Sequence, residues 1–233
     1  SDYSKAIELN PKYAESYNNR GIAYHKKGEL DQAISDYSKA IEIDPKNSEA
    51  YNSRGIAYHI KGRFEQAISD FSKAVELNPS YSRAYYNRGS AYYNKDDLVL
   101  AVASYSKAIE YNPKNSEAYN SRGIAYHARG KLELAVSDFS KAIEINPDYL
   151  SAYYNRGSVY YDKDDPDLAV SDFSKAIELN PQYAKAYCNR GAAYLLKKNY
   201  DKSWEDVHKA QDLGYKVPQG FINDLKKASG RGA

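Results

Sequence analysis

Few residues in this sequence could take part in catalysis or bind a metal ion, and the histidines among them are regularly spaced. Three of the four histidines, His25, His59 and His127, are separated by multiples of 34 residues, and the fourth is His208. A metal site needs its ligands within bonding reach of one ion, whereas packed helices lie roughly 8–10 Å apart. Histidines that hold one place in successive repeated units are therefore too far apart to share a metal ion, and we expect no metal site.

The sequence gives equally weak signals for nucleophilic catalysis, for cysteine-based sites and for a calcium loop. No serine or cysteine is paired with a base at a spacing typical of nucleophilic catalysis. The single cysteine, Cys188, excludes an intrachain disulfide and a cysteine-clustered metal site. The acidic stretch DKDDPD at 162–167 is similar to a calcium loop but lacks its glycine and closing glutamate. We interpret it as a solvated loop that caps the next helix. The sequence thus predicts a protein that is not an enzyme and has no cofactor.

Composition narrows the class of partner. Lys and Arg number 33 against 31 Asp and Glu, and this balance argues against nucleic acid, whose binding requires a basic excess. No apolar run approaches the roughly 20 residues that would cross a bilayer, so we expect no membrane insertion. The sequence has no methionine. It opens SDYSKAIELN, which matches SDYSKAIEID at 35–44, and we expect it to be part of a longer protein that starts midway through a repeated unit. The compartment is not fixed, although the cytoplasm is favoured.

The elements that position these residues form a repeat with a 34-residue period. Prolines mark it at Pro11, Pro45, Pro79, Pro113, Pro147 and Pro181. A fixed period of this length indicates stacked units whose apolar faces are covered by their neighbours. Each unit is predicted to contain two helices. The first is indicated by Tyr17, Gly21 and Tyr24, which share one helical face, and the second by the same spacing of Ala33, Tyr37 and Ala40.

Two kinds of residue are predicted to end these helices. Gly28 separates the two helices of its unit, and glycine adopts positive φ at no steric cost. Asp96 and Asp164 hold that place in later units, and aspartate tolerates positive φ better than most residues. An Asn or Asp before each proline ends the second helix, because a residue that precedes proline disfavours the α region.

The pattern Tyr17, Gly21, Tyr24, Ala33, Tyr37, Ala40, Pro45 resembles the tetratricopeptide repeat, and the resemblance covers nearly the whole chain. It implies an all-α fold, a right-handed superhelical solenoid of antiparallel helix pairs. We expect a partial repeat at 1–13, a capping helix and tail at 218–233, and six repeats between them. The six repeats cover 14–47, 48–81, 82–115, 116–149, 150–183 and 184–217.

The arginine before each repeat glycine is a departure from the family, which usually has leucine there. Five units also carry an aspartate 16 residues after this arginine, from Asp36 to Asp206, whereas the third unit has Ser104. We predict an Arg–Asp pair inside each of those five units, with the third unit as the exception. We interpret these arginines as structural rather than ligand-binding. A charge-reversal swap at Arg122 and Asp138 should rescue the two single reversals if the pair forms.

The last unit departs further. Ser203 and Val207 replace the expected alanine and aromatic residue. A further helix follows, in which Pro218 suits the first turn and Phe221, Ile222 and Leu225 form one apolar face. Such a helix closes the exposed end of a repeat stack. We interpret Trp204 as a packing residue.

The resemblance implies a groove whose inner wall is made by the first helices. Residues next to the packing stripe of those helices are asparagine, tyrosine and histidine, and an Asn amide matches the N–H and C=O groups of an extended peptide. Ser53 and Ser121 stand between asparagines of the same row. The candidate peptide-binding residues are Asn18, Asn19, His25, Asn52, His59, Tyr86, Asn87, Tyr93, Asn120, His127, Tyr154, Asn155, Tyr161 and Asn189. The alternation of Asn/His units with Tyr/Tyr units suggests a ligand with a two-unit pattern.

Other functions stay open. The same residues suit a purely architectural role, in solubility and packing between units. The face of the first segment that carries Tyr3, Ala6 and Ile7 lacks a partner helix, which suits end-to-end self-association of a structural scaffold. A carboxylate clamp of the kind that holds chaperone C-termini is disfavoured, because the first groove place in each unit holds no cation. RNA binding by a helical-repeat code is weakened by the neutral charge and by a unit of 34 rather than 35 residues.

Overall fold

A computed structural model describes residues 2–231 of the chain. Over that range the protein is all-α, as expected, with fourteen helices and no strand. The helices group into two compact units, one ending at Lys114 and the other beginning at Asn115.

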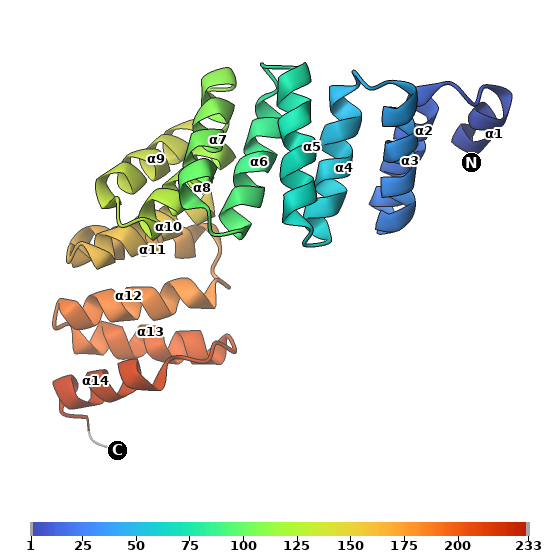
Figure 1. The fold of residues 1–233 in the computed structure, drawn as a ribbon. Coiled ribbons are helices and arrows are strands. Elements are labelled where there is room, and N and C mark those ends of the chain that lie inside the picture. Colours follow the sequence, from blue (N-terminus) through green and yellow to red (C-terminus); the bar gives the residue numbers. More distant parts are fainter. Residues whose placement is uncertain (1, 232–233) are drawn as a thin grey trace. The chain divides into compact units, whose positions relative to one another are not determined.

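The first unit contains a short helix followed by three helix pairs, in which consecutive helices run antiparallel and side by side (Figure 1). Its helices are α1 (Asp2–Leu9), α2 (Ala14–Lys26), α3 (Leu30–Ile43), α4 (Ser48–Ile60), α5 (Phe64–Leu77), α6 (Ser82–Asn94) and α7 (Leu98–Tyr111). The α1 helix packs against α2 and exposes 41% of Tyr3.

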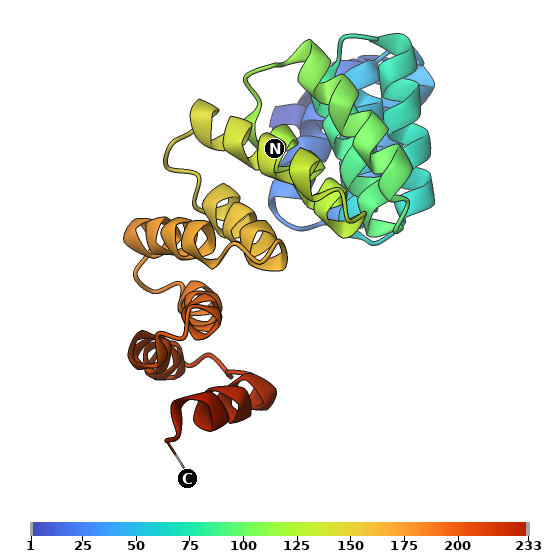
Figure 2. The same cartoon turned by 90° about the vertical axis from the view of Figure 1, so that its left-hand side faces the viewer.

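The second unit contains three further helix pairs and a final helix, and α12, α13 and α14 follow one another in its last part (Figure 2). Its helices are α8 (Ser116–Ala128), α9 (Leu132–Ile145), α10 (Leu150–Asp162), α11 (Pro166–Leu179), α12 (Ala184–Leu196), α13 (Tyr200–Asp212) and α14 (Gln219–Ser229).

Alanines and one aromatic ring form the core of each pair. In the second pair, Ala67, Phe71 and Ala74 of α5 are almost fully buried against α4. The ring of Phe71 lies so close to Gly55 that a Cβ at that glycine would fall 2.6 Å from Cε1 of the ring. Only glycine allows this approach, which explains why the sequence keeps glycine inside a helix, where it costs about 1 kcal/mol relative to alanine.

The predicted helix ends are confirmed. Gly28 has φ of 79°, and Asp96 and Asp164 have φ of 62° and 58° at the corresponding turns. Lys198 takes the same conformation in the last pair, with φ of 58°. The second helices end at the residue before proline, where the C-caps are Asp44, Asn78, Asn112, Asn146 and Asn180. The acidic stretch at 162–167 also caps a helix, because Asp165 accepts a hydrogen bond from the backbone N–H of Leu168 at 3.3 Å.

The predicted Arg–Asp pairs are present, and each arginine donates to both oxygens of its aspartate. In the first pair Arg20 donates to Asp36 at 2.7 and 2.8 Å, and the third pair has a single 3.2 Å bond from Arg88 to Ser104. The other bonded pairs are Arg54–Asp70, Arg122–Asp138, Arg156–Asp172 and Arg190–Asp206.

Tyrosine rings flank these arginines. The Arg20 guanidinium carbon lies 5.7 Å from the ring centre of Tyr17 and 5.9 Å from that of Tyr24, within the range of cation–π attraction. Arg54 also donates to the Ser38 hydroxyl of the preceding pair at 3.0 Å. The arginines of these pairs therefore hold helices together inside a pair and between pairs, which supports their structural interpretation.

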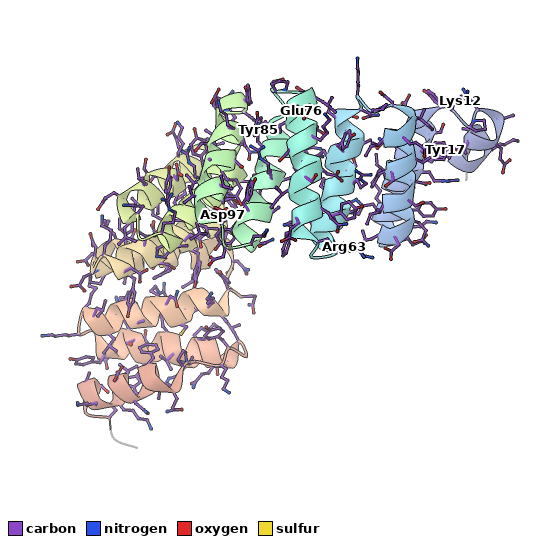
Figure 3. The ribbon with its side chains drawn as sticks, viewed as in Figure 1. Lys12, Tyr17, Arg63, Glu76, Tyr85 and Asp97 are labelled. Atoms are coloured by element: carbon purple, nitrogen blue, oxygen red, sulfur yellow. The ribbon has the colours of Figure 1, made fainter. Side chains whose placement is uncertain are left out.

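Ion pairs also link the turns of successive pairs along one edge of each unit. In the first unit Lys61 binds Asp31 at 2.5 Å and Lys95 binds Glu65 at 2.7 Å. Figure 3 labels Arg63 and Asp97 at this edge. The second unit has the corresponding bridges Lys163–Glu133, Lys197–Asp167 and Arg231–Asp201.

The final helix covers the last pair with the predicted apolar face. Leu225 of α14 is fully buried, and Phe221 and Ile222 pack in the same cluster as Val207. The helix begins at Gln219, one residue later than expected, because Pro218 has an extended ψ of 131°. Trp204 packs in this cluster as predicted.

Candidate functional site

The candidate wall lies on the first helices of the pairs, which are α2, α4 and α6 in the first unit and α8, α10 and α12 in the second. On each helix, residues seven apart and their neighbours lie beside the stripe that packs against the second helix. The structure thus places the predicted residues along one row in each unit. It shows three depths in that row.

The first position of each helix is mostly buried. Asn18, Asn52 and Asn120 expose 6%, 3% and 6% of their surface, and Tyr154 exposes 8%. Tyr86 is half-buried. The pKa of Tyr154 is raised to about 12, chiefly by burial. The three asparagines and Tyr154 therefore lie behind the accessible surface of the wall, whereas Tyr86 reaches it.

The second position is half-buried and bonds to the first position of the preceding pair. Asn87 donates through Nδ2 to Oδ1 of Asn52 at 2.9 Å, and Asn155 donates to Asn120 at 3.0 Å. Asn189 donates to the Tyr154 hydroxyl at 2.8 Å. A side-chain amide has two N–H donors and a carbonyl oxygen, so each of these asparagines retains further bonding capacity. Asn19 holds the same position on α2.

The third position is half-buried too, and two of its histidines contact the following pair. Nε2 of His59 lies 2.8 Å from Nδ2 of Asn94, and Nε2 of His127 lies 2.6 Å from Oδ2 of Asp162. Nδ2 of an asparagine only donates, so Nε2 of His59 accepts this bond, and burial lowers the pKa of His59. His25, Tyr93 and Tyr161 hold the same position.

A cavity beside the first wall helix was not predicted. About 390 Å³ in volume, it is lined by Tyr13, Ala14, Glu15, Asn18, Asn19, Asp44, Asn47 and Glu49. We name it the α2/α4 cavity, because it lies between the start of α2 and the turn that leads into α4. The signal available in the sequence was the pair of first-turn glutamates, Glu15 and Glu49.

A second cavity lies on the wall of the second unit. It measures about 260 Å³ and includes the predicted residues Tyr161 and Asn189, with the Phe173 ring and Cys188 among its other lining residues. Burial raises the pKa of the Cys188 thiol, which makes this cysteine a weak nucleophile.

The described residues offer neither a metal site nor a helix suited to a membrane. Residues 2–231 contain no group of three or more His, Cys, Asp or Glu side chains placed to hold a metal ion. None of the helices within that range has both the length and the apolar character that a bilayer crossing requires.

Comparison with protein families decides the family. One model of the tetratricopeptide repeat matches residues 14–47, 82–115 and 151–183. A second model of the same repeat matches residues 37–69, 104–137 and 173–205. A third model, described as TPR repeat, matches residues 57–96 and 125–164. The chain belongs to the tetratricopeptide repeat family. All six repeats keep the glycine of the expected pattern. The first five keep its proline, which Tyr215 replaces in the sixth, and the arginine is their distinctive addition. A comparison with curated proteins found no match.

Solved tetratricopeptide structures resemble this one. YrrB, described as a TPR protein with an unusual peptide-binding site, is 29% identical over 80% of this chain and 96% of its own, with a TM-score of 0.68. MamA is 33% identical over 71% of this chain and 96% of its own, with a TM-score of 0.66. Pseudomonas aeruginosa pilF is 17% identical over 94% of this chain and 97% of its own, with a TM-score of 0.76, which shows a shared fold alone.

Proposed function

We propose that this tetratricopeptide repeat protein is a non-catalytic scaffold that binds an extended segment of a partner protein along the wall of its first helices. The observation that carries the proposal is the row of asparagines bonded between pairs, such as Asn87 to Asn52 at 2.9 Å. The bond fixes the amide plane of Asn87 while leaving one N–H and the carbonyl oxygen for a ligand. Fixed donors and acceptors bind with less loss of conformational entropy than mobile ones.

The burial of each of the three wall positions suggests how its residues would take part in peptide binding. The half-buried asparagines would bond to the peptide backbone, and they are Asn19, Asn87, Asn155 and Asn189. The buried residues Asn18, Asn52, Asn120 and Tyr154 would hold this row in place rather than contact the ligand broadly. Side-chain preference would come from the rings beside them, which are His25, His59, Tyr86, Tyr93, His127 and Tyr161.

The peptide-binding site described for YrrB supports the same use of the fold here. The wall also presents rigid tyrosine surface, which gives contact area at low entropic cost.

A peptide selection tests the proposal. Random extended peptides are displayed and selected on the native chain, then rebound to a triple wall variant, Asn19→Ser, Asn87→Ser and Asn155→Ser. Serine already holds this position at Ser53 and Ser121, so the variant should fold, and circular dichroism checks that it does. The matched control changes exposed lysines of the second helices, Lys39→Ser, Lys73→Ser and Lys141→Ser.

We expect selected peptides to bind the control and to lose at least about tenfold in affinity for the wall variant, since each lost backbone hydrogen bond contributes about 0.5–1.5 kcal/mol. Peptides that bind both variants equally would contradict the proposal. A selection that yields no peptide would contradict it as well and favour a spacer role.

A second candidate, end-to-end self-association, is favoured by one observation. The α1 helix exposes 80% of Leu9 and 41% of Tyr3, and an apolar helix face at the end of a stack can propagate contacts. Sedimentation of the native chain at increasing concentration should then show larger species that Tyr3→Ser and Leu9→Ser abolish. A mass that does not change with concentration would exclude it.

A further inference from the structure

The α2/α4 cavity has an unusual lining for a wall otherwise made of amides and rings. Three of its eight lining residues are the carboxylates Glu15, Asp44 and Glu49, and none is cationic. Glu15 and Glu49 are exposed, so their charges face solvent. Carboxylates alone would be an ordinary solvated surface, and the argument for a site depends on a second feature beside them.

That feature is a buried acceptor without a donor. Asn18 lines the cavity and exposes only 6% of its surface, and its Oδ1 has no hydrogen-bond partner. An unpaired buried polar atom costs about 1–3 kcal/mol. Native structures keep few such atoms, and each calls for an explanation.

The repeat itself shows what belongs at this oxygen. Asn52 and Asn120 hold the same position in later pairs, and the Oδ1 of each accepts from an N–H of the following pair, donated by Asn87 and Asn155 at 2.9 and 3.0 Å. At the corresponding place for Asn18 the chain has Ser53, whose side chain is shorter. The missing group is therefore an N–H donor.

Several other polar groups around the cavity also act as acceptors. Asp44 already accepts from the backbone N–H of Lys46 at 3.0 Å, and Asn47 accepts from that of Ala50 at 2.9 Å. Glu15 accepts from the Tyr13 hydroxyl. The ring of Tyr13 is about half exposed, at 48%, and offers a face to a cation. A ligand that fits must bring several donors and a positive charge.

We propose that the α2/α4 cavity binds an arginine side chain of the partner segment. A guanidinium supplies five N–H donors in a planar fork, which pairs with carboxylates at two points and stacks on a tyrosine ring. A lysine ammonium supplies the charge but no fork. This inference rests on the proposed function, because it names one residue of the segment that the wall would bind.

The site is specific to the first pair of its unit. One pair further along, the places of Glu15 and Glu49 are taken by Glu49 and Arg83, and an arginine of the chain itself stands where the second carboxylate would be. The partner's arginine would therefore align the segment at α2 and set its register on the wall.

The first test uses single residues as probes and does not need the partner. The 233-residue chain, labelled with ¹⁵N, is titrated with N-acetyl-arginine amide, with the lysine analogue, and with N-acetyl-citrulline amide, the neutral isostere of arginine. We expect saturable shifts of backbone amides at 13–19 and 44–49 with arginine, weaker ones with lysine and none with citrulline. Added salt should weaken them, because exposed charges are screened.

Two variants and a matched control locate the binding. Glu49→Gln removes a charge and should weaken arginine binding about threefold, the size expected of an exposed ion pair. Ser53→Asn supplies the donor that the other pairs have and should weaken it as well. Glu117→Gln makes the same charge change at the corresponding position of α8 and should change nothing. Shifts that citrulline matches, or that Glu49→Gln leaves unaltered, would overturn the site, and equal binding of lysine would overturn its assignment to arginine.

The second test separates this inference from the function on which it rests. Peptides selected on the native chain are sequenced and compared with those selected on the double variant Glu15→Gln and Glu49→Gln. We expect one arginine position to be enriched on the native chain and lost on the variant. Peptides that bind the wall without this enrichment would overturn the inference and leave the function intact. Arginine binding in the titration without any selected peptide would support the arginine site in the α2/α4 cavity and contradict peptide binding along the wall.

Discussion

The first and third helix pairs, α2/α3 and α6/α7, have the same backbone but differ in the hydrogen-bond partners of their core arginine and tyrosine. In the first pair Arg20 has a carboxylate partner, Asp36, but the hydroxyl of the fully buried Tyr37 has no partner. In the third pair Arg88 donates to the Ser104 hydroxyl at 3.2 Å in place of a carboxylate, whereas the hydroxyl of Tyr105 donates to Ser90 at 3.3 Å.

The difference shows that a buried polar group is stabilised by the particular residue opposite it and not by the fold. Ile22 stands in the first pair where Ser90 stands in the third, so the Tyr37 hydroxyl is desolvated without compensation. Burial, and then the nearby Asp36, raise the pKa of Tyr37 to about 12. The first pair therefore contains a charged two-point contact and an unpartnered hydroxyl, whereas the third pair contains two longer single hydrogen bonds. Exchanging residues between the pairs should change their stabilities in opposite directions.

The largest effect is expected from Asp36→Ser, which gives the first pair the weak contact of the third. Arg20 would lose both of its charged hydrogen bonds while staying largely buried, and the free energy of unfolding of this pair should fall by about 2 kcal/mol. Amide hydrogen exchange of α2 and α3 measures the change, because repeat arrays unfold in parts. Unchanged exchange there would show that Arg20 does not depend on the carboxylate.

The reverse exchange, Ser104→Asp, should stabilise the third pair. A carboxylate opposite Arg88 restores the two-point contact seen in the other pairs, and we expect a gain of about 1 kcal/mol. Urea denaturation followed by exchange in α6 and α7 measures it. Ser104→Asn is the control for size without charge and should give a clearly smaller gain.

A smaller effect is expected at the two tyrosines. Tyr37→Phe removes a hydroxyl that has no partner and should raise the free energy of unfolding by about 0.5 kcal/mol, whereas Tyr105→Phe removes a bonded hydroxyl and should lower it by a similar amount. Thermal unfolding of both variants compares the signs. Shifts of the same sign would mean that ring packing outweighs hydroxyl pairing at these positions.

An effect no larger than that of the tyrosines is the coupling between positions 22 and 37. Ile22→Ser offers the Tyr37 hydroxyl the partner that Ser90 offers Tyr105. This substitution should cost about 0.5 kcal/mol less in the native chain than in the Tyr37→Phe background, as a double-mutant cycle measures. Zero coupling would show that the new hydroxyl does not reach the ring.

The sequence predicted the features that depend only on residues within a single repeat. The helix pairs, the turn at Gly28 and the Arg20–Asp36 contact all follow from spacing within one unit. Contacts that join one helix pair to the next were harder to predict, because they depend on which side chains meet when the two residues are 35 positions apart in the sequence. The Asn87–Asn52 bond is one of these. The sequence places Asn52 among the candidate peptide-binding residues, and the structure shows that it is buried behind this bond.

The α2/α4 cavity could not be predicted for the same reason. Its distinguishing feature is that Oδ1 of Asn18 has no donor, and this lack becomes visible only when the neighbouring pair is in place. The pattern of first-turn glutamates at Glu15 and Glu49 pointed to charge but gave no sign of the buried oxygen beside it. The peptide-binding role of the wall stays a prediction.

The single tryptophan gives the chain a built-in optical reporter. Trp204 donates from Nε1 to the Ser229 hydroxyl at 3.1 Å and stacks on His208 with ring centres 5.6 Å apart. Ser229 is the last residue of α14, so release of this helix would break the bond and change the indole's surroundings. Fluorescence excited at the red edge, where the 26 tyrosines do not absorb, would therefore follow the docking of the final helix separately from the unfolding of the first unit.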